Sequence, residues 1–171
     1  MFVVGERMTD KKVMVSACLL GENCRFDGGT CTNQALKDDL EDVQLILVCP
    51  EEMGGLSTPR PRARIVGREG NADGVDVLAG EAQVLTHEGK DVSDAYIRGG
   101  IKTLDLAKSS GAELAILKSN SPSCGCGQVF TEDFQNLKSG DGTTTAILKK
   151  AGIQVVNDSD YHQALNDYKK K

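Results

Sequence analysis

Short, almost uninterrupted apolar runs constrain the fold of this 171-residue chain more than any other feature. They cover residues 13–17, 43–48, 114–118 and 153–156. Runs this short, with no polar alternation, are typical of strands buried on both faces. Segments with helical spacing or helix-start signals lie between and after them, at 34–42, 91–110, 144–150 and from 158 onward. The sequence therefore predicts a single-domain α/β fold, with a largely parallel sheet and helices on both faces.

Two regions depart from this alternation. Residues 64–86 contain short β-like pieces at 65–66, 75–78 and 83–85 separated by glycine turns, which predicts a small antiparallel β excursion. Residues 1–12 precede the first strand and lack the apolar stretch of a signal peptide. We interpret 1–12 as a disordered leader or a cloning remnant, and 13–171 as one α/β domain.

The composition narrows the class of partner and the compartment. With 39% hydrophobic and 26% charged residues the chain resembles an ordinary globular protein, and its net charge of −5 argues against a nucleic-acid partner bound through general basicity. No apolar run is long enough to cross a bilayer, so no membrane partner is expected. We expect a cytoplasmic location, where six cysteines serve as metal ligands or catalytic groups more readily than as disulfides.

Three cysteines follow the ends of predicted strands. Cys18, Cys49 and Cys124 come at or just after the carboxyl ends of the first three runs. Those ends share one edge of a parallel sheet if the strands are close neighbours, so the three thiols are predicted to converge. The alternative is that each is a small buried apolar residue. Three thiolates leave one coordination position open on a zinc ion or on one iron of a four-iron cluster, which is the mark of a catalytic site.

The other cysteines and the two histidines are not assigned as ligands of this metal site. Cys24 and Cys31 follow Cys18 at spacings unusual for zinc or ferredoxin sites, so we assign them a structural role. Cys126 lies close enough to Cys124 to assist it or to misoxidise with it. His87 and His162 are predicted to lie on the surface.

Several motifs then resemble one bacterial family, long known as a domain of unknown function, which includes the thiouracil desulfidases. The resemblance covers residues 13–156 and rests on these blocks: Ser16-Ala17-Cys18-Leu19-Leu20-Gly21, Cys24-Arg25-Phe26-Asp27-Gly28, Cys49-Pro50-Glu51, Gly54-Gly55-Leu56, Thr58-Pro59-Arg60-Pro61, Gly89-Lys90-Asp91-Val92-Ser93, Leu117-Lys118-Ser119, Ser121-Pro122-Ser123-Cys124-Gly125 and Gly140-Asp141-Gly142.

The resemblance implies a function and a cofactor. It implies a [4Fe-4S] cluster held by Cys18, Cys49 and Cys124, which an aerobic preparation can lose or replace with zinc. It also implies a non-redox reaction that replaces the sulfur of a thiolated pyrimidine, as the base, nucleoside or nucleotide, with oxygen. Glu51 and Ser121 would flank the free iron, with Glu51 deprotonating water and Ser121 binding the substrate or relaying a proton.

Further residues and alternatives complete the prediction. Ser119, Ser123 and Arg60 are predicted to bind the substrate. Where the family pattern leads us to expect a proline and an acidic residue, this chain has Arg62-Ala63-Arg64, and the added positive charge is compatible with a phosphorylated substrate. We interpret the basic cluster of Arg60, Arg62, Arg64 and Arg68 as a solvated face in preference to a phosphate site. The alternative functions are a zinc-binding or iron–sulfur carrier, or a sensing domain, without turnover. The oligomeric state stays open.

Overall fold

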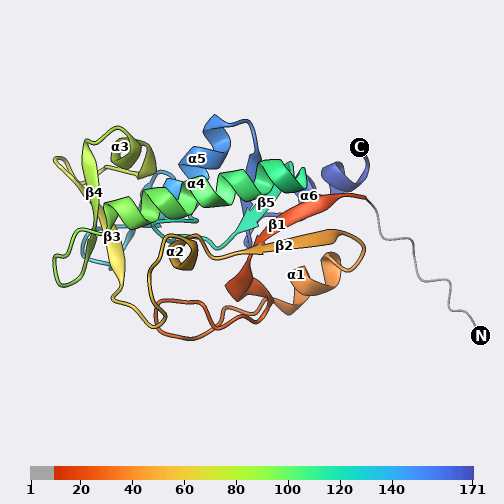
Figure 1. Cartoon of the computed structure of the whole chain (residues 1–171), viewed down its shortest axis with the longest axis horizontal. Coiled ribbons are helices and arrows are strands. Elements are labelled where there is room, and N and C mark those ends of the chain that lie inside the picture. Colours follow the sequence, from red (N-terminus) through yellow and green to blue (C-terminus); the bar gives the residue numbers. More distant parts are fainter. Residues whose placement is uncertain (1–9) are drawn as a thin grey trace, which may run out of the picture.

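The computed structural model describes residues 10–171, so most of the leader predicted over 1–12 lies outside the described residues. Its centre is a four-stranded parallel sheet in the order β2-β1-β5-β8 (Figure 1). The strands are β1 (Lys12–Ser16), β2 (Gln44–Val48), β5 (Leu114–Leu117) and β8 (Gln154–Asn157). The prediction of an α/β fold with a largely parallel sheet is confirmed.

Helices cover both faces of this sheet. Val13, Val15, Leu114 and Ile116 face α1 (Gln34–Asp39) and α6 (His162–Lys169) in one apolar cluster. Met14, Ala115 and Leu117, on the alternate positions of the same strands, pack in a second cluster with α4 (Ser93–Ser110) and α5 (Thr143–Lys150). Since successive side chains of a strand point to opposite faces, a run without polar residues requires cover on both. No helix within residues 10–171 is both long and apolar enough to cross a membrane.

Two antiparallel hairpins lie outside the sheet. The first pairs β3 (Ala63–Gly67) with β4 (Ala82–Thr86), which confirms the small antiparallel β excursion predicted over 64–86. The second pairs β6 (Gln128–Phe130) with β7 (Leu137–Ser139). Residues 75–78 were predicted as a β-like piece, and that prediction is wrong, because they belong to α3 (Gly74–Leu78). The Asp73 carboxylate accepts the Val75 N–H and the Asp76 carboxylate accepts the Asp73 N–H, so a capping box outweighs the β preference of two valines.

The long helix α4 connects the two parts of the molecule. Its start lies beside the β3–β4 hairpin and its end beside the parallel sheet (Figure 1). Tyr96, near the start, packs with the hairpin, whereas Ala107, near the end, packs with the sheet. A four-residue helix, α2 (Pro50–Met53), lies directly on α4. A Cβ atom on Gly99 of α4 would lie 1.8 Å from the Pro50 carbonyl oxygen, and one on Gly54 would lie 2.0 Å from the Ala95 carbonyl oxygen.

We expect Gly99→Ala to destabilise the protein by about 1–3 kcal/mol, because the added methyl group must push α2 off α4. The free energy of unfolding from a denaturant titration measures this effect. Lys102→Ala, on an exposed position of the same helix, is the matched control and should change stability by less than about 0.5 kcal/mol. Equal stability of Gly99→Ala and wild type would show that the two helices are not in close contact.

Candidate active site

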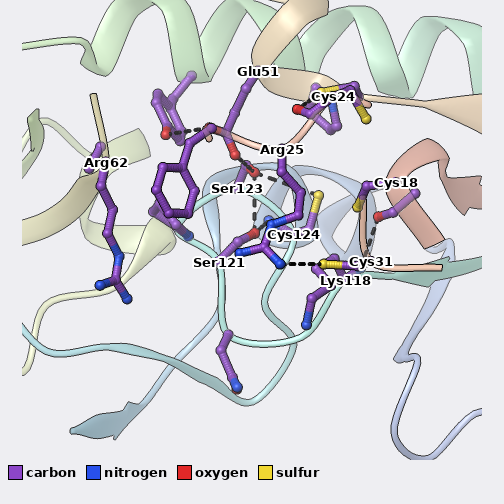
Figure 2. A pocket seen from close by; sticks show the side chains of 18 of the residues that line it. Cys18, Cys24, Arg25, Cys31, Glu51, Arg62, Lys118, Ser121, Ser123 and Cys124 are labelled. Carbon is purple, nitrogen blue, oxygen red and sulfur yellow. Dashed lines mark hydrogen bonds between the residues drawn. The ribbon is translucent and has the colours of Figure 1, made fainter. Parts of the chain in front are cut away.

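The strand order brings three cysteines to one edge of the sheet. Cys18 lies in the short 3₁₀ helix η1 (Ala17–Leu20) after β1, Cys49 follows β2 and precedes α2, and Cys124 lies in the loop after β5. Because β2, β1 and β5 are adjacent and parallel, their carboxyl ends meet. All three cysteines line one pocket of about 350 Å³. Figure 2 shows Cys18 and Cys124 among its lining side chains.

Two further cysteines, Cys24 and Cys31, line the same pocket, although the sequence predicts a structural role for them. The Cys24 and Cys49 sulfurs and a Glu52 carboxylate oxygen lie within 4.8 Å of one another. The Cys31 sulfur accepts a hydrogen bond of 3.1 Å from Arg25. Both thiols arrive through the loop after η1, which folds back so that the Cys31 N–H donates to the Cys18 carbonyl oxygen at 2.9 Å. The pocket therefore holds more thiols than the strand ends alone supply.

The sixth cysteine points elsewhere. The Cys126 thiol donates to the Val155 carbonyl oxygen at 3.4 Å and packs against the sheet, and Cys126 is not among the residues that line the pocket. His87 and His162 are 52% and 68% exposed and likewise lie outside the pocket lining, as predicted.

The thiols of Cys24, Cys49 and Cys124 are held in their neutral form unless a cation joins them. Burial raises the pKa of Cys124 to about 12, and a hydrogen bond with Cys18 together with burial raises the pKa of Cys24 to about 12. The pKa of Cys49 is raised by its hydrogen bond with Cys24 and by burial. A bound metal centre supplies the positive charge that thiolates need. Several soft sulfur donors in one buried pocket fit an iron–sulfur cluster or zinc, and do not fit a hard cation.

One carboxylate, that of Glu51, lines the pocket together with these thiols. Glu51, in α2, accepts hydrogen bonds from Arg60 Nε at 3.0 Å and Tyr96 OH at 2.8 Å on one oxygen, and from Ser123 Oγ at 2.8 Å on the other. The Arg60 and Glu51 side chains are 5% and 14% exposed. Burial, together with the neighbouring carboxylate, keeps the pKa of Tyr96 well above its usual value, so Tyr96 stays a hydrogen-bond donor. The Glu51 carboxylate is therefore fixed in orientation and acts as an acceptor toward all three partners.

The serines of the loop after β5 also line the pocket, as Ser119, Ser121 and Ser123. Ser121 Oγ accepts the Cys124 N–H at 2.8 Å and lies 3.4 Å from Ser123 Oγ. Ser119 Oγ accepts a hydrogen bond from Lys118 at 3.2 Å. The hydroxyls of Ser121 and Ser123 thus form a line that ends on Glu51 (Figure 2).

The basic cluster of the sequence divides into different roles. Arg60 lines the pocket, but its guanidinium is bonded to Glu51, to the Thr58 hydroxyl and to the Cys24 carbonyl oxygen. The geometry makes Arg60 a brace between α2 and the cysteine loop. Arg64 donates to two backbone carbonyl oxygens at the end of β4, those of Leu85 and Thr86. Arg68 is exposed, whereas Arg62 lines the pocket. The interpretation of all four as one solvated face is not what the structure shows.

The chain is similar to known proteins over nearly its whole length. The family model described as 2-thiouracil desulfurase matches residues 13–160. The chain is 39% identical over 154 residues to the uncharacterized protein YbbK of Bacillus subtilis (strain 168), a match that covers 90% of this chain and 99% of that protein. Among solved structures it is similar to the [4Fe-4S]-dependent thiouracil desulfidase TudS, with 35% identity, a TM-score of 0.76, and coverage of 94% of this chain and 99% of that one.

Proposed function

Since this chain belongs to the 2-thiouracil desulfurase family, we propose that it is an iron–sulfur-dependent desulfidase acting on a thiolated pyrimidine. The reaction consumes water and the thiocarbonyl compound and yields the carbonyl compound and hydrogen sulfide, so atoms balance without an oxidant or reductant. One observation carries the proposal: three strand-end thiols line the same pocket as the Glu51 carboxylate, whose orientation is fixed by hydrogen bonds.

Cys18, Cys49 and Cys124 would hold the cluster. Their thiols line one buried pocket, and three thiolates leave one iron without a protein ligand. The chemistry that such a cluster supplies when bound is an open iron position, which favours a soft thiocarbonyl sulfur and makes the ring carbon more electrophilic.

Glu51 is proposed as the general base. It would take a proton from water as the oxygen attacks the ring carbon, and Arg60 and Tyr96 hold the accepting carboxylate in place. Ser121 is proposed to bind the substrate or to relay a proton, and Ser123 lies between it and Glu51. The proposed substrate-site residues remain Ser119, Ser123 and Arg60. Arg60 would act indirectly, because its guanidinium holds the Glu51 carboxylate in place.

Anaerobic reconstitution with iron and sulfide, followed by an assay of sulfide release from 2-thiouracil and 4-thiouracil and their nucleosides and nucleotides, tests the proposal. We expect a brown protein with about four irons that converts at least one of these compounds. A fully loaded protein that releases no sulfide would instead be a carrier or sensing domain. Stoichiometric zinc without iron after anaerobic purification would make it a zinc-binding domain.

A further inference from the structure

Three metal-binding side chains lie closer together than the three strand-end cysteines do. The Cys24 and Cys49 sulfurs and a Glu52 carboxylate oxygen lie within 4.8 Å of one another. No other three cysteine, histidine or acidic side chains of residues 10–171 approach one another as closely. Ligands at about 2.0–2.3 Å from a tetrahedral ion lie roughly 3.5–4 Å apart, so a small closure of this trio would seat a single ion. The wider set of Cys18, Cys49 and Cys124 suits a larger group.

The short helix α2 brings Glu52 to Cys49. Cys49 is the N-cap of α2, and Glu52 is the third residue of that helix. Side chains at the N-cap and at this third position lie on the same side of a helix, as they do in a capping box. The Thr58 hydroxyl donates to the Glu52 carboxylate at 2.5 Å and so restricts its orientation. A carboxylate that ligates a metal usually has such an outer hydrogen bond.

The loop after η1 brings Cys24 to the same place. Arg60 joins this loop to α2, because its Nη2 atom donates to the Cys24 carbonyl oxygen at 2.8 Å and lies 4.0 Å from the Cys49 sulfur. The Cys49 sulfur in turn lies 3.7 Å from the Cys24 carbonyl oxygen. Both thiols are therefore held on one side of the Arg60 guanidinium by contacts that do not involve Cys18 or Cys124.

The donor set and its exposure select the ion. Soft thiolates do not suit magnesium or calcium, and a carboxylate oxygen does not suit copper(I), which prefers sulfur ligands. Zinc accepts cysteine sulfur and carboxylate oxygen together, and three protein ligands leave its fourth position to water. Cys24 is 6% exposed, whereas Glu52 is exposed, so an ion can reach the thiols from solvent along the carboxylate.

We propose that Cys24, Cys49 and Glu52 bind one zinc ion in the cluster-free protein. Cys49 belongs to this set and to the proposed cluster ligands, so zinc at this site and the iron–sulfur cluster exclude one another. Cys24 and Glu52 belong to the zinc set alone, and Cys124 belongs to the cluster set alone. The zinc site goes beyond the proposed desulfidase function and does not depend on it.

Zinc titration of the full chain, stripped of metal with a chelator and kept reduced without oxygen, tests the ligand set. In competition with a chromophoric chelator, wild type should bind one zinc per chain. Cys24→Ser and Glu52→Gln should each weaken binding by at least about 10-fold, since loss even of a residue that supports a ligand costs 10–100-fold. Cys124→Ser should bind zinc like wild type. Glu22→Gln, exposed in the loop after η1, and Cys126→Ser are the matched controls and should bind normally.

Glu52→Gln keeps the test valid if Cys24→Ser proves unstable, because Glu52 is exposed and its loss leaves the buried thiols in place. Cobalt(II) in place of zinc gives a second measurement, because its sulfur-to-metal charge-transfer absorption should fall in Cys24→Ser and persist in Cys124→Ser. Zinc lost from Cys124→Ser but kept by Cys24→Ser would overturn the proposal and place the ion on the strand-end cysteines. Equal zinc affinity of wild type, Cys24→Ser and Glu52→Gln would overturn it as adventitious binding.

Reconstitution of zinc-loaded protein tests the exclusion. Wild type that holds one zinc should take up little iron when iron and sulfide are added without oxygen, and removal of the zinc should restore uptake. Cys24→Ser should take up iron whether or not zinc is present, because its zinc site is broken while Cys49 remains available. Full iron uptake by wild type with zinc still bound would refute the exclusion. A protein that desulfurises a thiopyrimidine but binds no zinc when cluster-free would overturn only the zinc site, and the reverse result only the desulfidase function.

Discussion

We expect Cys18→Ser, Cys49→Ser and Cys124→Ser each to leave the reconstituted protein colourless and nearly free of iron. The three thiols follow neighbouring strands and line one pocket, so a cluster held by three ligands would lose a third of its protein attachment. Loss of even a residue that supports a metal ligand typically costs 10–100-fold in affinity, and loss of the ligand should cost at least about that much. Iron and sulfide analysis with visible absorption after anaerobic reconstitution measures the effect, against about four irons in wild type.

The other three cysteines supply controls that lie at different distances from the proposed cluster site. Cys126→Ser should keep the cluster, because this thiol donates to the Val155 carbonyl oxygen and lies outside the pocket lining. Cys24→Ser and Cys31→Ser are also predicted to keep it. The Cys24 variant is the most informative, because its sulfur lies within 4.8 Å of the Cys49 sulfur. Iron lost from Cys24→Ser but kept in Cys18→Ser would put Cys24 in place of Cys18 in the ligand set.

The sheet could be predicted from the sequence because strands buried on both faces consist of nearly uninterrupted apolar residues. The four apolar runs at 13–17, 43–48, 114–118 and 153–156 correspond to β1, β2, β5 and β8. Residues 75–78 were misassigned because β-branched side chains suggested a strand, while the local hydrogen bonds of Asp73 and Asp76 start a helix. The β6–β7 hairpin was not foreseen, since its strands of three residues are too short to show a period.

The candidate site was predictable only where topology fixes it. Parallel strands bring their ends together, so Cys18, Cys49 and Cys124 could be grouped in advance. The approach of Cys24 and Cys31 depends on tertiary contacts of their loop, such as the hydrogen bond from Thr30 Oγ1 to the Cys18 carbonyl oxygen at 2.8 Å, and no spacing rule encodes it.

The groups that hold Glu51 were hidden for the same reason. Tyr96 and Ser123 are 45 and 72 residues away from it in sequence, and Arg60 is nine residues away across a loop. Its closeness to Cys49 placed Glu51 near the metal centre, but only the structure supplies the three donors. One signal was available: a buried carboxylate requires partners, and Arg60 was the nearest cation to Glu51 in the chain.

We expect Glu51→Gln to lower the rate of desulfurisation by about 10²–10⁴-fold while iron content stays at the wild-type level, because general-base catalysis is worth about that much. The amide keeps the shape of the carboxylate: its oxygen can accept from Arg60 and Tyr96, and its NH₂ group can donate to Ser123 Oγ. The proton acceptor is lost, and so is the counter-ion of buried Arg60. Sulfide release in a single turnover measures the rate. Iron analysis and thermal unfolding of the same samples show whether the cluster and the fold are intact.

Tyr96→Phe is the control that separates basicity from positioning. It removes the 2.8 Å hydrogen bond to Glu51 but leaves the carboxylate and its ion pair with Arg60 in place. If Glu51 acts as the base, Tyr96→Phe should lose far less activity than Glu51→Gln, because the proton acceptor remains. If the two variants lose activity equally with full iron content, the essential feature is the fixed geometry around Arg60 and not the basicity of Glu51. If Glu51→Gln turns over at the wild-type rate, the proton goes to another group, and the serine line from Ser123 to Ser121 is the next route to test.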